Sequence, residues 1–350
     1  MNKDVCVSVV ITTYNAENFI CECLDATISQ TYSNLDIIIV DDNSADSTKR
    51  ICSEYADKDS RIRLFSLSNN GVSAARNLGI DKAQGEYIVF FDADDKPELN
   101  LIEEYLRALE EWENKTVSFV TCGMFYDNMF NKNIDNKISI LESYYGYIEG
   151  ENYLLRKSYA ATLAWLKVFN FVTNKIYDLN KINEFNIRFD EKVNIGEDLK
   201  FNLDYLEKKH GYIGMINKPL YHYIKRTDDS LSFTYHVNDI DDTKDIYRRF
   251  MNWEACQKGV TLDNILVVKS IFLTDWNSRL STMYDTFYKN GHARDCLKRI
   301  NSEINSQEYQ TLLNEVFQAK KISRLRYMTL KTRRFQIFLF FRWIYQLMKG

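Results

Sequence analysis

Three short apolar runs near the amino end of the chain each finish in a cluster of polar side chains. The runs cover residues 5–11, 35–40 and 87–91. Their β-branched and aromatic residues predict short buried strands, and helical patterns lie between them. Such alternation with short connections predicts an α/β fold with a doubly wound, mostly parallel, Rossmann-like sheet. Because the carboxyl ends of parallel strands meet at one edge of a sheet, we expect the three polar clusters to line one crevice.

The third run ends in four residues that carry three carboxylates, Asp92-Ala93-Asp94-Asp95. Mutual repulsion makes such clustering costly unless a cation or hydrogen bonds offset it. Mg²⁺ and Mn²⁺ prefer oxygen ligands and usually retain waters and substrate phosphates. The cluster therefore favours a metal that bridges the protein and a diphosphate. A solvated acidic turn or a helix cap is the alternative, and we expect Asp95 to be a local cap.

Five motifs follow one another in the first two-thirds of the chain. They are Thr12-Thr13-Tyr14-Asn15, Asp41-Asp42-Asn43-Ser44, Gly71-Val72-Ser73-Ala74-Ala75-Arg76-Asn77, Asp92-Ala93-Asp94-Asp95 and Gly196-Glu197-Asp198. This series resembles glycosyltransferase family 2, the inverting enzymes of the GT-A fold, and especially the bacterial transferases of capsule, exopolysaccharide and lipopolysaccharide assembly. The resemblance covers about residues 5–235. It divides the chain into a catalytic domain, 1–235, and a helical C-terminal region, 236–350.

The resemblance implies a nucleotide-sugar site at the first two strand ends. Thr12 and Tyr14 can supply a hydroxyl and a ring to the base, and the family places a uracil imide on a residue such as Asp42. Helix capping is the alternative for Asp42. Arg76 is the kind of group that clamps a diphosphate or orients the acidic cluster. A helix-surface arginine in a salt bridge is the alternative for that residue.

The resemblance also implies a divalent cation, Mn²⁺ or Mg²⁺, on the diphosphate. Asp94 and Asp92 are the expected metal ligands, and Asp92 with Ala93 is expected to contact the nucleotide-sugar. His222 is a candidate for a further metal or diphosphate ligand, and a structural histidine between tyrosines is the alternative. Arg226 is expected to close over the diphosphate, unless it belongs to a plain surface loop.

Asp198 is the candidate general base. Inverting transfer needs one carboxylate to take the proton of the acceptor hydroxyl on the face opposite the leaving group. Glu197 and Asp198 start a predicted helix, whose N-terminal dipole favours carboxylates. We expect Glu197 to support the same step. Ordinary enrichment of acids at a helix start is the alternative.

The chain ends in a change of composition. Residues 320–350 contain nine Lys or Arg residues and no Asp or Glu. The apolar part runs from Phe335 to Tyr345 and is interrupted by Arg342. We expect a basic and aromatic amphipathic segment that contacts a membrane surface rather than spans it. A terminal helix that packs on the protein's own core is the alternative.

The overall composition excludes several classes of protein. A formal net charge of -4 gives no signature of a nucleic-acid partner. Seven cysteines without framework spacing indicate a reducing compartment. No apolar run of about 20 residues and no signal-like segment are found, so we expect a cytoplasmic protein that is peripheral on the inner face of the membrane. The sequence does not indicate the oligomeric state.

We therefore expect an inverting hexosyl- or N-acetylhexosaminyltransferase. It would move a sugar from a nucleotide-sugar, a UDP-sugar, to a saccharide or lipid-linked saccharide acceptor in bacterial surface polysaccharide biosynthesis. Two other classes remain open. A metal-dependent nucleotidyltransferase usually has a phosphate loop rich in glycine and lysine, where this chain has Thr12-Thr13-Tyr14-Asn15. A non-catalytic nucleotide-sugar-binding subunit would not need to keep both the acidic cluster and Glu197-Asp198.

Overall fold

The computed structural model describes residues 5–128, 152–226, 235–290 and 293–332, together with Phe335 and Ile337. The chain divides into two compact units. The first comprises residues 1–159, 166–193 and 197–227, and the second comprises residues 160–165, 194–196 and 228–350. The two units are described separately below.

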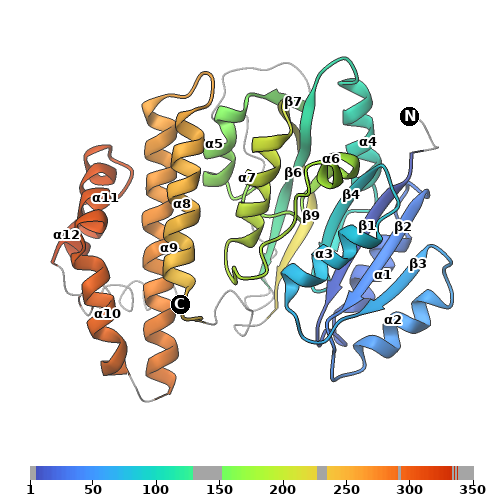
Figure 1. The fold of residues 1–350 in the computed structure, drawn as a ribbon, viewed down its shortest axis with the longest axis horizontal. Helices are drawn as coiled ribbons and strands as arrows, with labels where there is room; N and C mark the ends of the chain where they lie inside the picture. The colour runs from blue at the N-terminus through green and yellow to red at the C-terminus, as the bar shows by residue number, and fades with distance from the viewer. Residues whose placement is uncertain are drawn as a thin grey trace. The chain divides into compact units, whose positions relative to one another are not determined.

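The first unit is built on one mixed sheet (Figure 1). Its strands are β1 (Val7–Thr13), β2 (Leu35–Asp41), β3 (Ile62–Ser66), β4 (Tyr87–Asp92), β5 (Lys96–Pro97), β6 (Val117–Asn128), β7 (Asn152–Leu155), β8 (Lys175–Asp178) and β9 (Tyr212–Lys225). The order across the sheet is β3-β2-β1-β4-β8-β6-β9-β5, and β7 pairs with β9. The three apolar runs are thus all strands of one sheet.

One half of the sheet, β3-β2-β1-β4, is entirely parallel, and in the other half β6 also pairs in parallel with β9. Strands β3, β2, β1 and β4 pair in parallel, which confirms the expected α/β arrangement for this part of the chain. Strand β8 then runs antiparallel to both β4 and β6. The other half of the sheet is therefore mixed, which the alternating pattern of the first hundred residues could not reveal.

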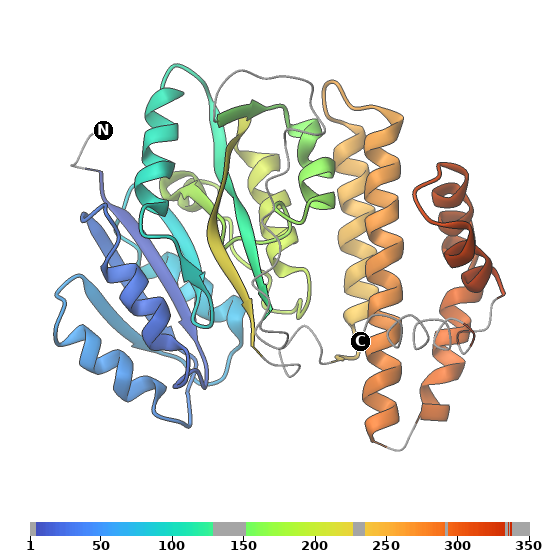
Figure 2. The same cartoon turned by 180° about the vertical axis from the view of Figure 1, so that it is seen from behind.

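Helices cover both faces of this sheet (Figures 1 and 2). On one face lie α1 (Ile20–Ile28), α2 (Thr48–Ala56) and α4 (Leu101–Glu111), which share a core with Val7, Val9 and Ile11 of β1. On the other lie α3 (Val72–Lys82), α6 (Leu179–Glu184) and α7 (Glu197–Lys208). Alternate residues of each central strand face opposite layers, so both faces are apolar and the strands are buried throughout.

The layer that contains α3 and α7 is tightly packed. A methyl group added at Gly79 of α3 would lie 2.3 Å from Val10 Cγ1, so only glycine permits this approach of helix to strand. Aromatic rings fill the rest of the layer: Phe189 stacks on Phe201 with centroids 4.1 Å apart, and Phe90 meets Phe201 edge to face at 5.9 Å. This packing holds α7 against the sheet and fixes the position of the residues at its start.

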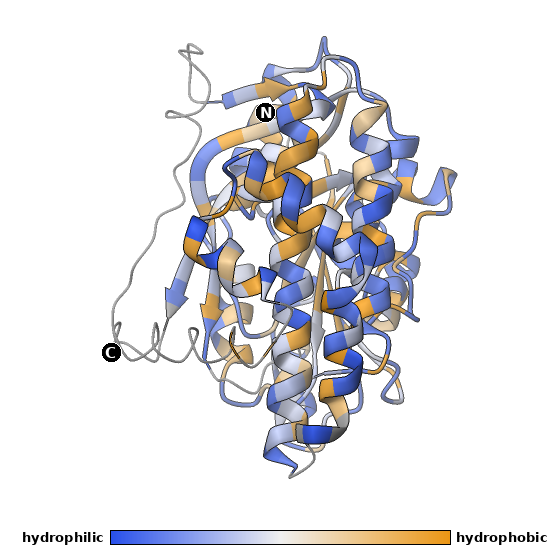
Figure 3. Cartoon of the chain, turned by 90° about the vertical axis from the view of Figure 1, so that its left-hand side faces the viewer, coloured by the Kyte–Doolittle hydropathy of each residue, from blue (hydrophilic) through white to orange (hydrophobic). Residues whose placement is uncertain are grey.

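The second unit is helical, as the pattern after residue 238 predicts. Its helices are α5 (Ala160–Trp165), α8 (Asp239–Ala255), α9 (Leu262–Lys289), α10 (Ala293–Asn305), α11 (Gln307–Gln318) and α12 (Arg324–Lys331). They mix hydrophilic and hydrophobic residues, as amphipathic helices do (Figure 3). Within the described ranges, no helix is both long enough and apolar enough to cross a membrane. Most of the predicted membrane-contacting segment, Phe335–Tyr345, lies outside the described residues.

A buried acid in the second unit should make stability depend on pH. Glu254 of α8 is 0% exposed, and burial raises its pKa from 4.5 to about 8. The folded protein therefore holds a proton that the unfolded chain releases, and the free energy of unfolding should fall between pH 4.5 and 8 by roughly 3–5 kcal/mol. We expect Glu254→Gln to raise the melting temperature at pH 8 but not at pH 5. Asp245→Asn, at an exposed position of α8, should change neither value; equal melting temperatures for Glu254→Gln and wild type at pH 8 would contradict the buried neutral acid.

Candidate functional site

The polar ends of three neighbouring strands meet at one edge of the sheet, as the sequence predicts. Thr12 of β1 pairs with Asp92 of β4, and Thr13 pairs with Asp41 of β2. Asp41 Oδ1 accepts a hydrogen bond from Ser44 Oγ over 2.5 Å, which shapes the loop after β2. The clusters that lie far apart in the sequence therefore form one surface.

Arg76 lies at the centre of this surface. It belongs to α3 and is 3% exposed. Its Nη2 donates to Asp92 Oδ1 over 3.0 Å, and its Nη1 donates to Asp198 Oδ1 over 2.7 Å. Glu197 Oε1 lies 3.4 Å from the same Nη1, and the guanidinium carbon lies 5.3 Å from the centroid of the Phe189 ring. One buried guanidinium thus joins the acidic cluster after β4 to the start of α7.

This arrangement decides between the two expectations for Arg76. A helix-surface arginine is wrong, because the side chain is buried and binds three carboxylates. Both terminal nitrogens of the guanidinium are engaged, so the geometry favours a residue that orients the acidic cluster. Direct contact with a diphosphate stays a prediction.

The acids around Arg76 have altered proton affinities. Burial, with a contribution from Asp198, raises the pKa of Glu197 to about 7. Burial also raises the pKa of Asp198, although Arg76 opposes this shift. Burial alone would lower the pKa of the Arg76 guanidinium, but its carboxylate neighbours, led by Asp198, raise it. A carboxylate whose pKa lies closer to neutrality is a better general base than an ordinary surface acid.

Asp94 presents its carboxylate to solvent beside Asp92. The residue is exposed, and its own backbone provides a hydrogen bond to its carboxylate. Desolvation by the surrounding protein and the charge of Asp92 raise the pKa of Asp94 to about 6. A bound cation would relieve this repulsion, so the pair fits the predicted metal site. In the described residues, no group of three or more His, Cys, Asp or Glu is placed to hold a metal ion, so an ion at Asp92 and Asp94 would take its other ligands from water and phosphates.

Asp95 has a different role from the one predicted. It is 2% exposed, and its Oδ1 accepts a hydrogen bond from Ile224 N of β9 over 2.9 Å. The expectation of a local cap is therefore wrong, because the partner lies 129 residues away in the sequence. Tyr221 of β9 completes the support: its hydroxyl accepts a hydrogen bond from Asp92 N over 3.2 Å. Strand β9 thus fixes the position of the acidic cluster through Tyr221 and Ile224.

The predicted base-binding residues lie at the first two strand ends. Thr12 and Ala93 are buried and joined, since Ala93 N donates to the carbonyl of Thr12 over 3.3 Å, whereas Tyr14 is 57% exposed. Asp42 is buried, and its two oxygens accept hydrogen bonds from Asn70 N and Gly71 N, each over 2.8 Å. Asp42 therefore shapes the entrance to α3. A further contact from its oxygens to a base stays a prediction.

His222 is engaged by two carboxylates. Its Nδ1 lies 2.7 Å from Asp127 Oδ2, and its Nε2 lies 2.7 Å from Glu98 Oε1. The ring also stacks on Phe125 with centroids 4.3 Å apart. With both nitrogens bonded, no lone pair of the ring faces a metal in this arrangement, and the geometry favours the structural alternative.

Arg226 lies beside the acidic cluster. Its Nε donates to the carbonyl of Asp94 over 3.0 Å, and its Nη2 binds Glu22 Oε2 over 2.8 Å. The guanidinium carbon also lies 4.9 Å from the centroid of the Phe19 ring. A plain surface loop does not explain these contacts, and the predicted contact with a diphosphate stays a prediction. The segment that follows, residues 227–234, lies outside the described residues.

Sequence reasoning missed the buried residues behind Asp198. Val172 N donates to Asp198 Oδ2 over 3.0 Å, and Lys175 and Asn202 hold the segment that carries Val172. One signal was present in the sequence, because Asn174-Lys175 directly precedes the apolar residues Ile176 and Tyr177 of a predominantly apolar stretch at 163–178. A polar pair in such a stretch must find partners inside the protein.

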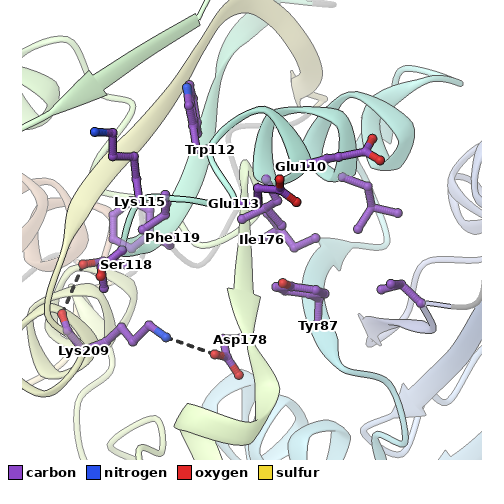
Figure 4. Close-up of a pocket in the computed structure, with 15 residues that line it drawn as sticks. Tyr87, Glu110, Trp112, Glu113, Lys115, Ser118, Phe119, Ile176, Asp178 and Lys209 are labelled. Atoms are coloured by element: carbon purple, nitrogen blue, oxygen red, sulfur yellow. Dashed lines mark hydrogen bonds and ion pairs between the residues drawn. The ribbon is translucent and has the colours of Figure 1, made fainter. Parts of the chain in front are cut away.

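A cavity of about 460 Å³ lies at the opposite edge of the sheet (Figure 4). Val5 and Tyr87, at the beginnings of β1 and β4, line it together with Asp178 and Lys209. Lys209 Nζ binds Asp178 Oδ2 over 3.1 Å in this wall. None of the predicted site residues lines the cavity, so the candidate site is defined by its convergent side chains at the carboxyl ends of the strands.

Arg76→Lys tests whether stability and turnover require the planar guanidinium, which binds Asp92 and Asp198 through separate nitrogens. A lysine keeps the charge but cannot bind Asp92 and Asp198 in the same planar geometry. We expect the loss of one charge-assisted hydrogen bond to lower the free energy of unfolding by about 1.5–3 kcal/mol and to reduce turnover. Urea denaturation followed by fluorescence would measure the first effect. Arg188→Lys, at a half-exposed arginine that binds Asp81, is the matched control; equal stability losses in both variants would contradict a central role for Arg76.

Comparisons with known proteins agree on one family. The model for "Glycosyl transferase family 2" matches residues 8–183. The glycosyltransferase GlyA of Streptococcus pneumoniae is 34% identical over 191 residues, which cover 51% of this chain and 26% of that protein. The uncharacterized glycosyltransferase EpsJ of Bacillus subtilis is 30% identical over 233 residues, which cover 65% of this chain and 64% of that protein.

A third relative is the minor teichoic acid biosynthesis protein GgaB of Bacillus subtilis. It is 32% identical over 231 residues, which cover 64% of this chain and 23% of that protein. The aligned region is therefore less than two-thirds of each of these three relatives. Among solved structures, a fragment of S. aureus TarS in complex with UDP-GlcNAc is similar, with a TM-score of 0.61, 17% identity and coverage of 95% of this chain and 88% of that one. This likeness shows the GT-A fold.

Proposed function

Because the chain belongs to glycosyltransferase family 2, we propose that it moves a sugar from a UDP-sugar to a saccharide acceptor, with inversion at the anomeric carbon. The acceptor is a lipid-linked saccharide of bacterial surface polysaccharide biosynthesis. Relatives named for glycosyl transfer and for teichoic acid biosynthesis support this assignment, and the TarS fragment of the same fold is in complex with UDP-GlcNAc.

The observation that carries the proposal is the buried Arg76, which joins Asp92 to Asp198. Donor and acceptor must meet with the acceptor oxygen opposite the leaving diphosphate. A single rigid cation between the acidic cluster and the candidate base fixes their separation. A nucleotide binder without catalysis would not need this link.

In the proposed reaction, Asp198 accepts the proton of the acceptor hydroxyl as the acceptor oxygen forms its bond to the anomeric carbon. The bond from that carbon to the diphosphate oxygen breaks in the same step, and UDP leaves. A divalent cation, Mn²⁺ or Mg²⁺, held by Asp94 and Asp92, would supply positive charge to the diphosphate. Thr12, Tyr14 and Asp42 bind the base, and Arg226 turns from Glu22 toward the diphosphate.

A panel of nucleotide-sugars tests this function. Thermal shift with Mn²⁺ present should single out a UDP-sugar, because a ligand that binds the folded state raises the melting temperature. Product analysis with that donor should show sugar transfer or, without acceptor, slow release of UDP. Release of pyrophosphate would indicate a nucleotidyltransferase, and binding without turnover on any acceptor would indicate a binding subunit.

Membrane contact by the C-terminal segment is part of the same proposal. Nine basic residues and no acids in residues 320–350 give this segment a positive charge that anionic lipids attract. We expect the full chain to sediment with anionic liposomes at low salt, and removal of residues 320–350 to abolish this binding. Transfer to a soluble acceptor analogue should survive the truncation. A full-length chain that ignores anionic liposomes would overturn the membrane assignment.

A further inference from the structure

An irregular and largely buried segment of the first unit, residues 166–174, directly precedes β8 in the sequence. Val168, Phe169, Val172 and Asn174 are each at most 1% exposed. A buried segment without helix or strand pairing must still satisfy its backbone carbonyl and amide groups. The side chains that provide this satisfaction are themselves unusual for a protein interior.

Three polar side chains bind the carbonyls of the segment. Lys175 Nζ donates to the carbonyls of Val168 and Phe171 over 2.7 and 2.5 Å. Asn202 Nδ2 donates to the carbonyls of Phe169 and Phe171 over 2.7 and 3.1 Å. Asn174 Nδ2 also donates to Val168, over 3.1 Å, and its Oδ1 accepts from Lys175 Nζ over 2.9 Å. Lys175 and Asn202 are each 0% exposed.

The segment ends in a donor that faces the candidate base. Val172 N donates to Asp198 Oδ2 over 3.0 Å, while Asp198 Oδ1 binds Arg76. Asn202 lies four residues after Asp198 on α7, so both side chains face the segment from one side of the helix. This face of α7 therefore accepts a hydrogen bond from the segment through Asp198 and donates hydrogen bonds to it through Asn202.

Lys175 also contributes charge. Its three partners are neutral oxygens, and desolvation lowers the pKa of Lys175 to about 7. No carboxylate binds its ammonium directly within the described residues, and the charge of Asp198 is the one that favours its protonated form most strongly. A buried ammonium at this place favours the ionised form of Asp198 in return.

We propose that Lys175 and Asn202 are positioning residues for Asp198. They fix the segment 166–174 so that Val172 N holds Asp198 Oδ2, which leaves the remaining lone pairs of the carboxylate aimed at the acceptor side. The catalytic meaning of this assignment rests on the proposed function, but the coupling of the segment to Asp198 does not.

The test follows Asp198 and the Val172 amide by NMR. Protein labelled with ¹³C at aspartate and ¹⁵N at valine is titrated with acid, and Asp198→Asn assigns the Asp198 signal. Other charged or titratable groups act on Asp198 and must be followed or held fixed; they are Arg76, Asp92, Glu197 and Tyr177. In the wild type, the Val172 amide shift should follow the Asp198 titration.

Two variants separate geometry from charge. Lys175→Met should uncouple the Val172 amide and raise the titration midpoint of Asp198 by about 1 pH unit, because the positive charge is lost. Asn202→Ala should uncouple the amide with a smaller change of midpoint, and it keeps the test available if Lys175→Met does not fold. Tyr205→Phe, which removes a buried hydroxyl of α7 that binds Asp178 N, should change neither signal.

Enzyme kinetics give the second readout. With the nucleotide-sugar that the panel identifies, Lys175→Met and Asn202→Ala should lower kcat about 10-fold or more and leave the donor KM nearly unchanged. The proposal would be overturned if both variants kept the wild-type titration midpoint of Asp198 and the wild-type response of the Val172 amide shift. It would also be overturned if Tyr205→Phe altered these two quantities as Lys175→Met and Asn202→Ala do. A wild type that turns over no donor would remove the proposed function, and the NMR titration would still decide the coupling.

Discussion

Asp198→Asn should lower turnover by about 10²–10⁴-fold, the usual cost of removing a positioned general base. Asparagine keeps the size of the side chain, but its single oxygen can accept from only one of Arg76 Nη1 and Val172 N. We therefore expect donor affinity to change little and the free energy of unfolding to fall. Steady-state turnover, combined with donor titration by calorimetry, measures the two effects separately. Near-normal turnover would remove Asp198 from the mechanism.

The pH profile gives an independent check on the same residue. A general base must be ionised to accept a proton, and burial raises the pKa of Asp198. As the pH is lowered, the rate should therefore begin to fall at a higher pH than it would for an ordinary aspartate, whose pKa is about 4. Because the pKa of Glu197 is about 7, this residue is already protonated over the acid limb, and Glu197→Gln should leave the limb in place. Asp204→Asn, on the outer part of α7, is the control and should leave the profile unchanged. A product that retains the anomeric configuration of the donor would overturn the single-displacement scheme.

Asp94→Ala should lower turnover by about 10²–10³-fold with the fold intact. The loss corresponds to several kcal/mol of charge stabilisation on the leaving diphosphate, and each 1.4 kcal/mol is tenfold. Because Asp94 is exposed and its carboxylate is bonded to its own backbone, its removal should not lower the melting temperature.

Metal dependence provides the control for Asp94. In the wild type, EDTA should abolish donor binding and Mn²⁺ should restore it. In Asp94→Ala, donor binding should be weak and insensitive to both. Asp81→Ala, at an exposed aspartate of α3, should behave as the wild type. Full activity of the wild type in EDTA, or of Asp94→Ala in any buffer, would remove the metal assignment.

The parallel half of the fold and the strand ends of the site could be read from the sequence. Strand periodicity placed β1, β2 and β4, and the geometry of parallel sheets then brought Thr12, Asp42 and Asp92 together. This inference needs only local patterns and one topological rule. The antiparallel β8 could not be placed in the same way, because four residues carry too little pattern to indicate a partner.

The contacts that fix the site depend on partners far apart in the sequence. Asp95 resembles a local cap by its position, yet its partner is Ile224. The sequence does not distinguish Arg76 from an ordinary arginine on a short helix, because its partners Glu197 and Asp198 belong to the distant helix α7. Buried polar residues are costly and therefore informative, but a single sequence does not say which distant backbone groups they serve.

The place of β8 has a consequence for synthesis of the chain. Strand β8 lies between β4 and β6, although it is made after both. While a ribosome is still translating residues before 175, β4 and β6 have been made but the edges that will pair with β8 are unpaired. The charge of Arg76 also lacks its partner Asp198 at this stage. Such edges are templates for aggregation. The first unit should therefore remain dependent on chaperones until β9 emerges, because β9 completes the pairing of β6.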